Sequence, residues 1–143
     1  NRTRNVLTND RNELAESHMT WSPVGNLIVH SAIPAGAEAH NLYFISADGL
    51  NQPIQVTMMA SDDIYPQYSP DGRYVAFSSN RGEDYNVFLV DMNTREVVAQ
   101  ITSGNRATFL GNWVLPDNFA PPQGGALDDP GLTPLPPSPE PAP

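Results

Sequence analysis

The sequence predicts an all-β protein with two four-stranded antiparallel sheets, partial units at both ends and an irregular proline-rich tail. One observation is a turn pattern, Trp21-Ser22-Pro23-Val24-Gly25, which returns 47 residues later as Tyr68-Ser69-Pro70-Asp71-Gly72. A second is a pair of strand-like runs 45 residues apart, Asn41-Leu42-Tyr43-Phe44-Ile45 and Asn86-Val87-Phe88-Leu89-Val90. A third is the composition, because fifteen prolines and ten glycines indicate many turns. Marks that recur at a fixed period are typical of repeat architectures.

The first unit covers residues 9–57. We expect strands at 18–22, 26–32, 40–47 and 52–57, where β-branched and aromatic residues are frequent. Asp48-Gly49 predicts a type I′ hairpin turn between the last two strands. The predicted structural turn residues of this unit are Ser22, Pro23 and Gly25.

The second unit covers residues 58–102, with strands expected at 64–69, 73–79, 86–91 and 96–102. Its tight turn is predicted at Ser69, Pro70, Asp71 and Gly72, because proline presets φ and Asp-Gly tolerates the left-handed conformation. We expect Asp71 to hydrogen-bond within its own turn. Arg81 is expected to hold the next loop through a carbonyl group or Glu83.

Two further strand signals flank these units. Residues 5–8 match the outermost strand of a preceding unit, and residues 107–115 match the first strand of a partial third unit at 103–119. The residues predicted to pair during assembly are Asn5, Val6, Leu7, Thr8, Phe109, Leu110 and Trp113. The repeat region is therefore 1–119, and the tail is 120–143.

The second unit resembles the WD40-like, or PD40, repeat of TolB-type β-propellers. The resemblance rests on the aromatic-Ser-Pro-Asp-Gly turn at 68–72 and on Ser79-Asn80-Arg81-Gly82, which is similar to the loop that follows in that family. It implies that each four-stranded sheet is a propeller blade. It also implies export, to the periplasm or the extracellular space of a bacterial cell envelope.

Some predicted strands are apolar on both faces. Residues 27–29 and 43–45 are continuously hydrophobic rather than alternating, which is typical of a sheet covered on both sides. Blades of a propeller cover one another in this way. Two blades alone leave two outer faces bare, so we expect another protein surface to cover them.

Composition argues against several functions. The net charge is −9, and all seven basic residues are arginines scattered from Arg2 to Arg106, whereas nucleic-acid binding needs a clustered positive face. Cysteine is absent, no Gly-x-Ser-x-Gly motif occurs, and His18, His30 and His40 lack the spacing of metal ligands. We therefore expect no enzyme activity, catalytic residue, cofactor or metal site.

Four aspartates are candidate ligands for Ca²⁺, which binds carboxylate oxygens. They are Asp62, Asp63, Asp71 and Asp84. Their spacing matches no calcium-binding loop, so they are interpreted as solvated loop residues. His30 aligns with Phe77 of the second unit and is interpreted as packed within its strand.

The tail has the composition of a linker or stalk. Residues 121–143 contain no aromatic residue and no positive charge, and their prolines favour the polyproline II conformation. Thr133 and Ser138 lie beside prolines and are candidate O-glycan sites if the protein is exported.

The sequence thus predicts a non-catalytic structural or interaction protein. We expect an exported repeat subunit that assembles with itself into a ring or an extracellular filament by strand exchange. One alternative is a terminal fragment of a TolB-like periplasmic propeller that docks another envelope protein. Another is the substrate-gating propeller portion of a peptidase. No nucleic-acid partner and no membrane span are predicted.

Overall fold

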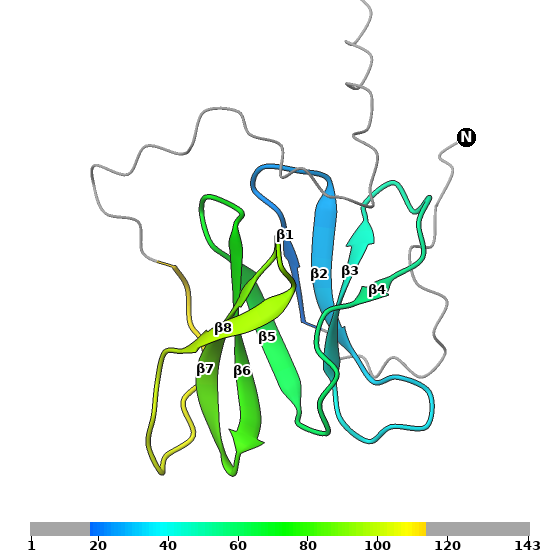
Figure 1. The fold of residues 1–143 in the computed structure, drawn as a ribbon. Helices are drawn as coiled ribbons and strands as arrows, with labels where there is room; N and C mark the ends of the chain where they lie inside the picture. The colour runs from blue at the N-terminus through cyan, green and yellow to red at the C-terminus, as the bar shows by residue number, and fades with distance from the viewer. Residues whose placement is uncertain (1–17, 114–143) are drawn as a thin grey trace, which may run out of the picture.

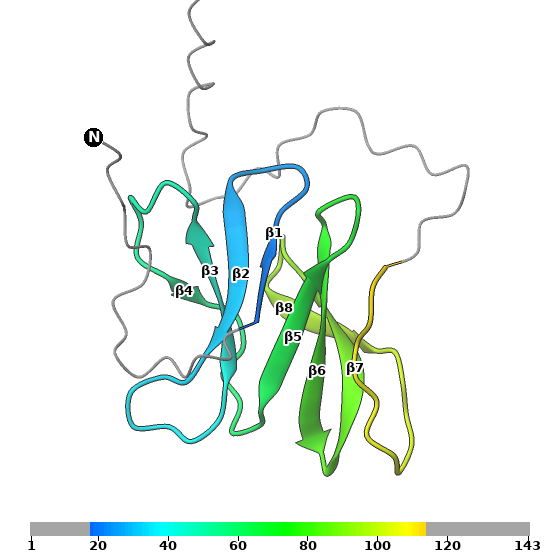
Figure 2. The same cartoon turned by 180° about the vertical axis from the view of Figure 1, so that it is seen from behind.

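The computed structural model describes residues 18–113, which form two four-stranded antiparallel sheets (Figures 1 and 2). The first sheet contains β1 (Met19–Trp21), β2 (Leu27–Ala32), β3 (Asn41–Ser46) and β4 (Ile54–Gln55). The second contains β5 (Asp63–Tyr68), β6 (Tyr74–Gly82), β7 (Asp84–Asp91) and β8 (Glu96–Gln100). This confirms the predicted fold class. The described range contains no helix, and so none that could cross a membrane.

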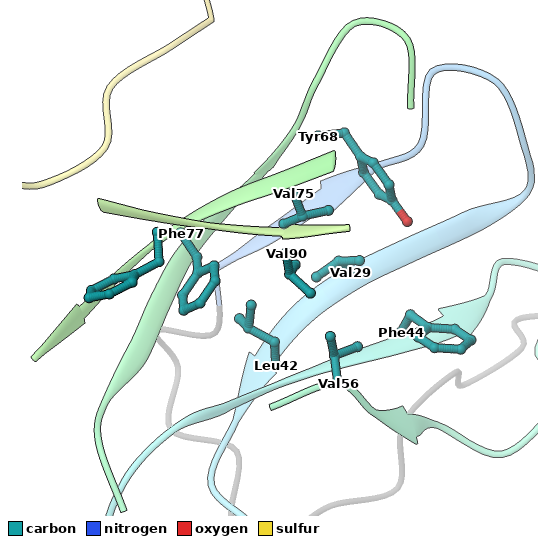
Figure 3. Packing of buried hydrophobic residues seen from close by; sticks show 9 residues of the cluster. Val29, Leu42, Phe44, Val56, Tyr68, Val75, Phe77 and Val90 are labelled. Atoms are coloured by element: carbon teal, nitrogen blue, oxygen red, sulfur yellow. The ribbon is translucent and has the colours of Figure 1, made fainter. Parts of the chain in front are cut away.

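Each sheet follows the chain in order, so every strand pairs with its neighbour in sequence. The two sheets pack face to face, and β5 lies against β1, β2 and β3 of the first sheet (Figure 1). The buried apolar side chains between the sheets form one cluster (Figure 3). Its members are Val29, Leu42, Phe44 and Val56 from the first sheet, and Tyr68, Val75, Phe77, Phe88 and Val90 from the second.

The two sheets repeat one another down to single hydrogen bonds. The Leu42 N–H donates to the Thr57 hydroxyl at 2.9 Å, and 45 residues later the Val87 N–H donates to the Thr102 hydroxyl at 2.9 Å. These bonds fasten the residues that follow β4 and β8 to the third strand of each sheet. The period read from the sequence is therefore a structural period.

Two details of the strands differ from the predictions. The hairpin at Asp48-Gly49 is not a type I′ turn, because only Gly49 has a positive φ, of 71°. The Gly49 N–H donates to the Ser46 carbonyl at 3.0 Å, so residues 46–49 form a turn whose last residue is the left-handed glycine. Strand β4 is also shorter than expected. Pro53 has no N–H to donate, and the N–H groups of Val56 and Thr57 both donate to the Leu42 carbonyl, at 2.7 and 3.4 Å, which interrupts the regular ladder after Gln55.

Residues 107–113, the described part of the predicted strand at 107–115, do not form a strand. The segment nevertheless lies where the first strand of a third sheet would begin. Its Thr108 N–H donates to the Tyr85 carbonyl at 2.7 Å. This repeats the bond from the Asp63 N–H to the His40 carbonyl at 2.8 Å, again 45 residues earlier. No partner strand for it lies within residues 18–113, so no ladder forms.

Candidate functional site

The second sheet contains a buried ion pair between β5 and β6 that was not predicted from the sequence. Arg81, at the end of β6, places Nη2 3.1 Å from each carboxylate oxygen of Asp63 at the start of β5. Asp63 is fully buried, and the Arg81 side chain is 15% exposed. The guanidinium also donates to the Ser79 hydroxyl and lies over the rings of Phe77 and Phe88. The prediction that Arg81 binds a carbonyl group or Glu83 was therefore wrong.

Asp62 ties the loop before β3 to the second sheet. Its Oδ1 accepts hydrogen bonds from the His40 backbone N–H at 2.8 Å and contacts the His40 ring Nδ1 at 2.7 Å. Its Oδ2 accepts from the Tyr85 hydroxyl at 2.9 Å, and its own N–H donates to Asn80. The interpretation of these loop acids as merely solvated was wrong for Asp62 and Asp63.

These contacts shift two ionisation equilibria. Burial of the Asp62 carboxyl opposes its ionisation, but the hydrogen bonds from His40 and Tyr85 outweigh burial and lower its pKa. Burial, together with the hydrogen bond to Asp62, raises the pKa of Tyr85 to about 12. Both shifts favour the pairing of a neutral Tyr85 hydroxyl with an ionised carboxylate.

The predicted turn residues lie at the β1–β2 and β5–β6 connections. In the second turn the Gly72 N–H donates to the Ser69 carbonyl at 2.8 Å, and Gly72 has a φ of 72°. The Asp71 carboxylate accepts from the Ser69 hydroxyl and the Arg73 N–H, so it serves its own turn. Pro70 lies between these residues.

The first turn is built differently. Val24 stands where the second turn has Asp71, and its N–H donates to the Ser22 hydroxyl at 3.4 Å. Gly25 is not among the glycines with positive φ, and Pro23 is exposed. A Cβ atom added at Gly72 would lie 2.3 Å from Val24 Cγ2, so the two turns pack closely against each other.

Four rings, those of His18, Tyr65, Phe109 and Tyr85, contact one another in a row. The rings of His18 and Tyr65 are 3.8 Å apart, those of Tyr65 and Phe109 are 5.9 Å apart, and those of Phe109 and Tyr85 are 4.9 Å apart. The Trp113 indole N–H donates to the Gln67 carbonyl at 3.3 Å, so this side chain lies against β5, the strand that contains Tyr65. A partial signal was present in the sequence, since His18 and Tyr65 are 47 residues apart, the offset of the turn pattern.

The polar and aromatic side chains described above contact one another or the backbone. The described histidine rings contact Asp62, Tyr65 and Tyr43, and His30 is buried within its strand. Within residues 18–113, no group of three or more His, Asp or Glu side chains is placed to hold a metal ion.

Of the predicted assembly residues, Phe109, Leu110 and Trp113 lie together in the segment beside β5. Its contacts include the hydrogen bond from the Leu110 N–H to the Ser78 hydroxyl at 2.9 Å. Asn5, Val6, Leu7 and Thr8, and the candidate glycan sites Thr133 and Ser138, lie outside the described residues.

Comparison with solved structures finds similar folds. No family model matches the chain, and no curated protein matches it. The structure of a protein assigned as TolB from Agrobacterium tumefaciens is similar, with 26% sequence identity and a TM-score of 0.56. The match covers 66% of this chain and 32% of that one, so the chain spans about a third of the similar protein. The two sheets thus have a TolB-like β-propeller fold, while membership of the PD40 repeat family stays a prediction.

Proposed function

We propose that the chain is a non-catalytic structural protein whose propeller-type repeats dock head to tail on further copies, in a ring or an extracellular filament. The observation that carries the proposal is the segment 107–113. It occupies the position of a first strand on the outer face of the second sheet, yet has no ladder partner among the described residues. Such an unpaired strand can bind a strand from a neighbouring chain through main-chain hydrogen bonds.

The packing of the two sheets on each other indicates how two copies would pack. Because the two sheets are repeats, the outer face of the first sheet corresponds to the face that the second sheet buries in the core. Trp21 stands where the second sheet has Tyr68, and Trp21 is exposed whereas Tyr68 is buried. On the outer side of the second sheet, Ile101 corresponds to the buried Val56 and is likewise exposed.

Trp21 and Ile101 lie on different faces of the chain, so a contact between them is heterologous. The other apolar residues on the outer face of the first sheet, Ile28 and Ile45, are buried, so the proposed contact on that face centres on Trp21. A heterologous contact closes into a ring when the rotation between copies permits and otherwise continues as a filament. The strand exchanged in this arrangement is residues 5–8 of the next copy, the other strand-forming segment predicted outside the two sheets. Export to the periplasm or extracellular space belongs to the same proposal and is supported by the likeness to TolB.

Light scattering coupled to gel filtration, followed by negative-stain electron microscopy, tests the proposal on the full chain. We expect particles larger than one chain, whose mass rises with protein concentration. Ile101→Asp places a charge in the proposed contact and should weaken association at least tenfold. Leu50→Asp is the matched control, because Leu50 is exposed in the β3–β4 hairpin, and it should leave the mass unchanged.

Deletion of residues 1–8 separates strand exchange from face-to-face packing. Loss of assembly in this variant supports exchange, provided that circular dichroism shows an intact β-sheet. A full chain that stays monomeric at about 100 μM, or an Ile101→Asp variant that assembles like the unmodified protein, would refute self-assembly.

The likeness to TolB favours one second candidate, in which the same exposed faces dock a different envelope protein. In that case the purified chain remains a monomer and forms a complex only with the other protein. The concentration series described above therefore also distinguishes the two candidates.

A further inference from the structure

We propose that residues 132–141 of the tail dock on an aromatic strip of the same chain, made of Tyr65, Phe109 and Trp113. This contact involves ring faces, and it does not depend on self-assembly. The sequence of the segment, LTPLPPSPEP, favours polyproline II, which has no internal hydrogen bonds and a fixed, low-entropy shape.

The strip has the features of a surface that binds such a segment. Phe109 is 51% exposed, Trp113 is 39% exposed and Tyr65 is 37% exposed. Phe109 meets Tyr65 edge to face, with an interplanar angle of 83°, so the two rings present surfaces of different orientation. Known proline-rich ligands bind in grooves lined by aromatic side chains.

Tyr65 is held in place by its backbone as well as by its neighbours. It has a φ of 54°, in the left-handed region that a bulky residue rarely adopts, and it lies where the β5–β6 register shifts between Ile64 and Gln67. Strain of this kind persists only where the surroundings fix the conformation. The His18 ring at 3.8 Å and Phe109 provide that support. The exposed part of the Tyr65 ring is therefore preorganised and loses little side-chain entropy on binding.

The length of the connection explains why the chain's own tail is the occupant. Trp113 belongs to the strip, and residues 114–131 connect it to the proposed ligand segment. A random-coil chain of that many residues would have a root-mean-square span of about 20–25 Å, which is enough to return the segment to the strip. Tethering gives an effective concentration on the order of millimolar, so a segment with an affinity of about 100 μM would be mostly bound. A tail from a second copy competes only when the protein itself approaches that concentration.

Two measurements on the full chain test this inference. The first is the indole N–H resonance of Trp113 in ¹H–¹⁵N spectra of the triple variant Pro134→Ala, Pro136→Ala and Pro137→Ala. We expect the Trp113 resonance to move more than the Trp21 resonance, because Trp113 belongs to the strip whereas Trp21 lies in β1 of the first sheet. The matched control replaces Pro121, Pro122 and Pro130 by alanine and should move neither resonance.

The second measurement places a photo-crosslinking phenylalanine analogue at position 109 and locates the cross-link by mass spectrometry. We expect cross-links to residues 132–141, with a yield at least tenfold lower in the triple variant. Mixing ¹⁴N- and ¹⁵N-labelled protein shows whether the link lies within one chain. An unmoved Trp113 resonance, cross-links elsewhere in the protein, or links only between differently labelled chains would each overturn the proposal.

Discussion

Replacing Arg81 by leucine should be among the most destabilising single changes in the second sheet. The substitution leaves the carboxylate of Asp63 fully buried without its two hydrogen bonds of 3.1 Å from Arg81. Removing one partner of a buried pair typically costs about 3–5 kcal/mol, because the other charge stays desolvated and unpaired. Contacts of the guanidinium with Phe77 and Phe88 are lost as well, although leucine replaces part of that packing. For a domain of this size, about 3 kcal/mol lowers the melting temperature by roughly 12 °C or more.

Urea unfolding at pH 7, followed by circular dichroism, measures this cost in a double-mutant cycle. Asp63→Leu, Arg81→Leu and the double variant form the cycle, and we expect the double variant to lose less stability than Arg81→Leu alone, since it buries no unpaired charge. Arg73→Leu is the control. Arg73 pairs with Asp91 at 3.2 Å, but its side chain is 53% exposed, so its loss should cost less than about 1 kcal/mol. An Arg81→Leu cost no larger than that of Arg73→Leu, or costs that simply add, would refute this reasoning.

Two further predictions concern the turns and Asp62. Gly72→Ala should lower the free energy of unfolding by about 1 kcal/mol more than Gly36→Ala. Both glycines have positive φ, but only a Cβ at Gly72 would meet a neighbour, Val24. Equal urea midpoints for the two variants would show that Val24 moves away freely. Because the folded-state pKa of Asp62 is lowered from its ordinary value of 3.8, its contribution to stability is present above that pH and is lost as the pH falls below it. Tyr85→Phe removes one stabilising hydrogen bond, so the loss of stability between pH 7 and pH 3 should be smaller than in the unmodified protein, and an identical loss would contradict this assignment.

The sheets could be predicted from the sequence because their signals are local. The turn at 68–72 contains its own proline, carboxylate and glycine, and each strand pairs with the next one along the chain. The turn at 48–49 was misread because Asp-Gly suits both a type I′ turn and an ordinary turn that ends in a left-handed glycine. Only the φ of Asp48 distinguishes these two turns, and sequence does not determine it.

The polar contacts of Asp62 and Asp63 could not be predicted because they join residues that are distant in sequence. Asp63 and Arg81 are separated by 18 positions, and Asp62 and Tyr85 by 23. In the sequence, Asp62-Asp63 resembles any acidic loop. Asp63 is fully buried and Asp62 is partly buried because β5 starts against the loop that precedes β3, where the Asp63 N–H donates to the His40 carbonyl. Sequence periodicity indicates which segments are equivalent, but not which side chains pair with one another.

The contact that follows the second sheet differs in its side chains from the contact between the two sheets. The main-chain bond from Asp63 to His40 recurs 45 residues later from Thr108 to Tyr85, so the backbone geometry is the same. The side chains differ, because Ala107 and Thr108 stand where the contact between the two sheets has Asp62 and Asp63. The contact after the second sheet therefore lacks the carboxylates that bind Arg81 and His40 in the earlier one. An interface without buried carboxylates needs no matching cation and incurs no charge desolvation when it forms. This composition suits a surface that exchanges one covering segment for another.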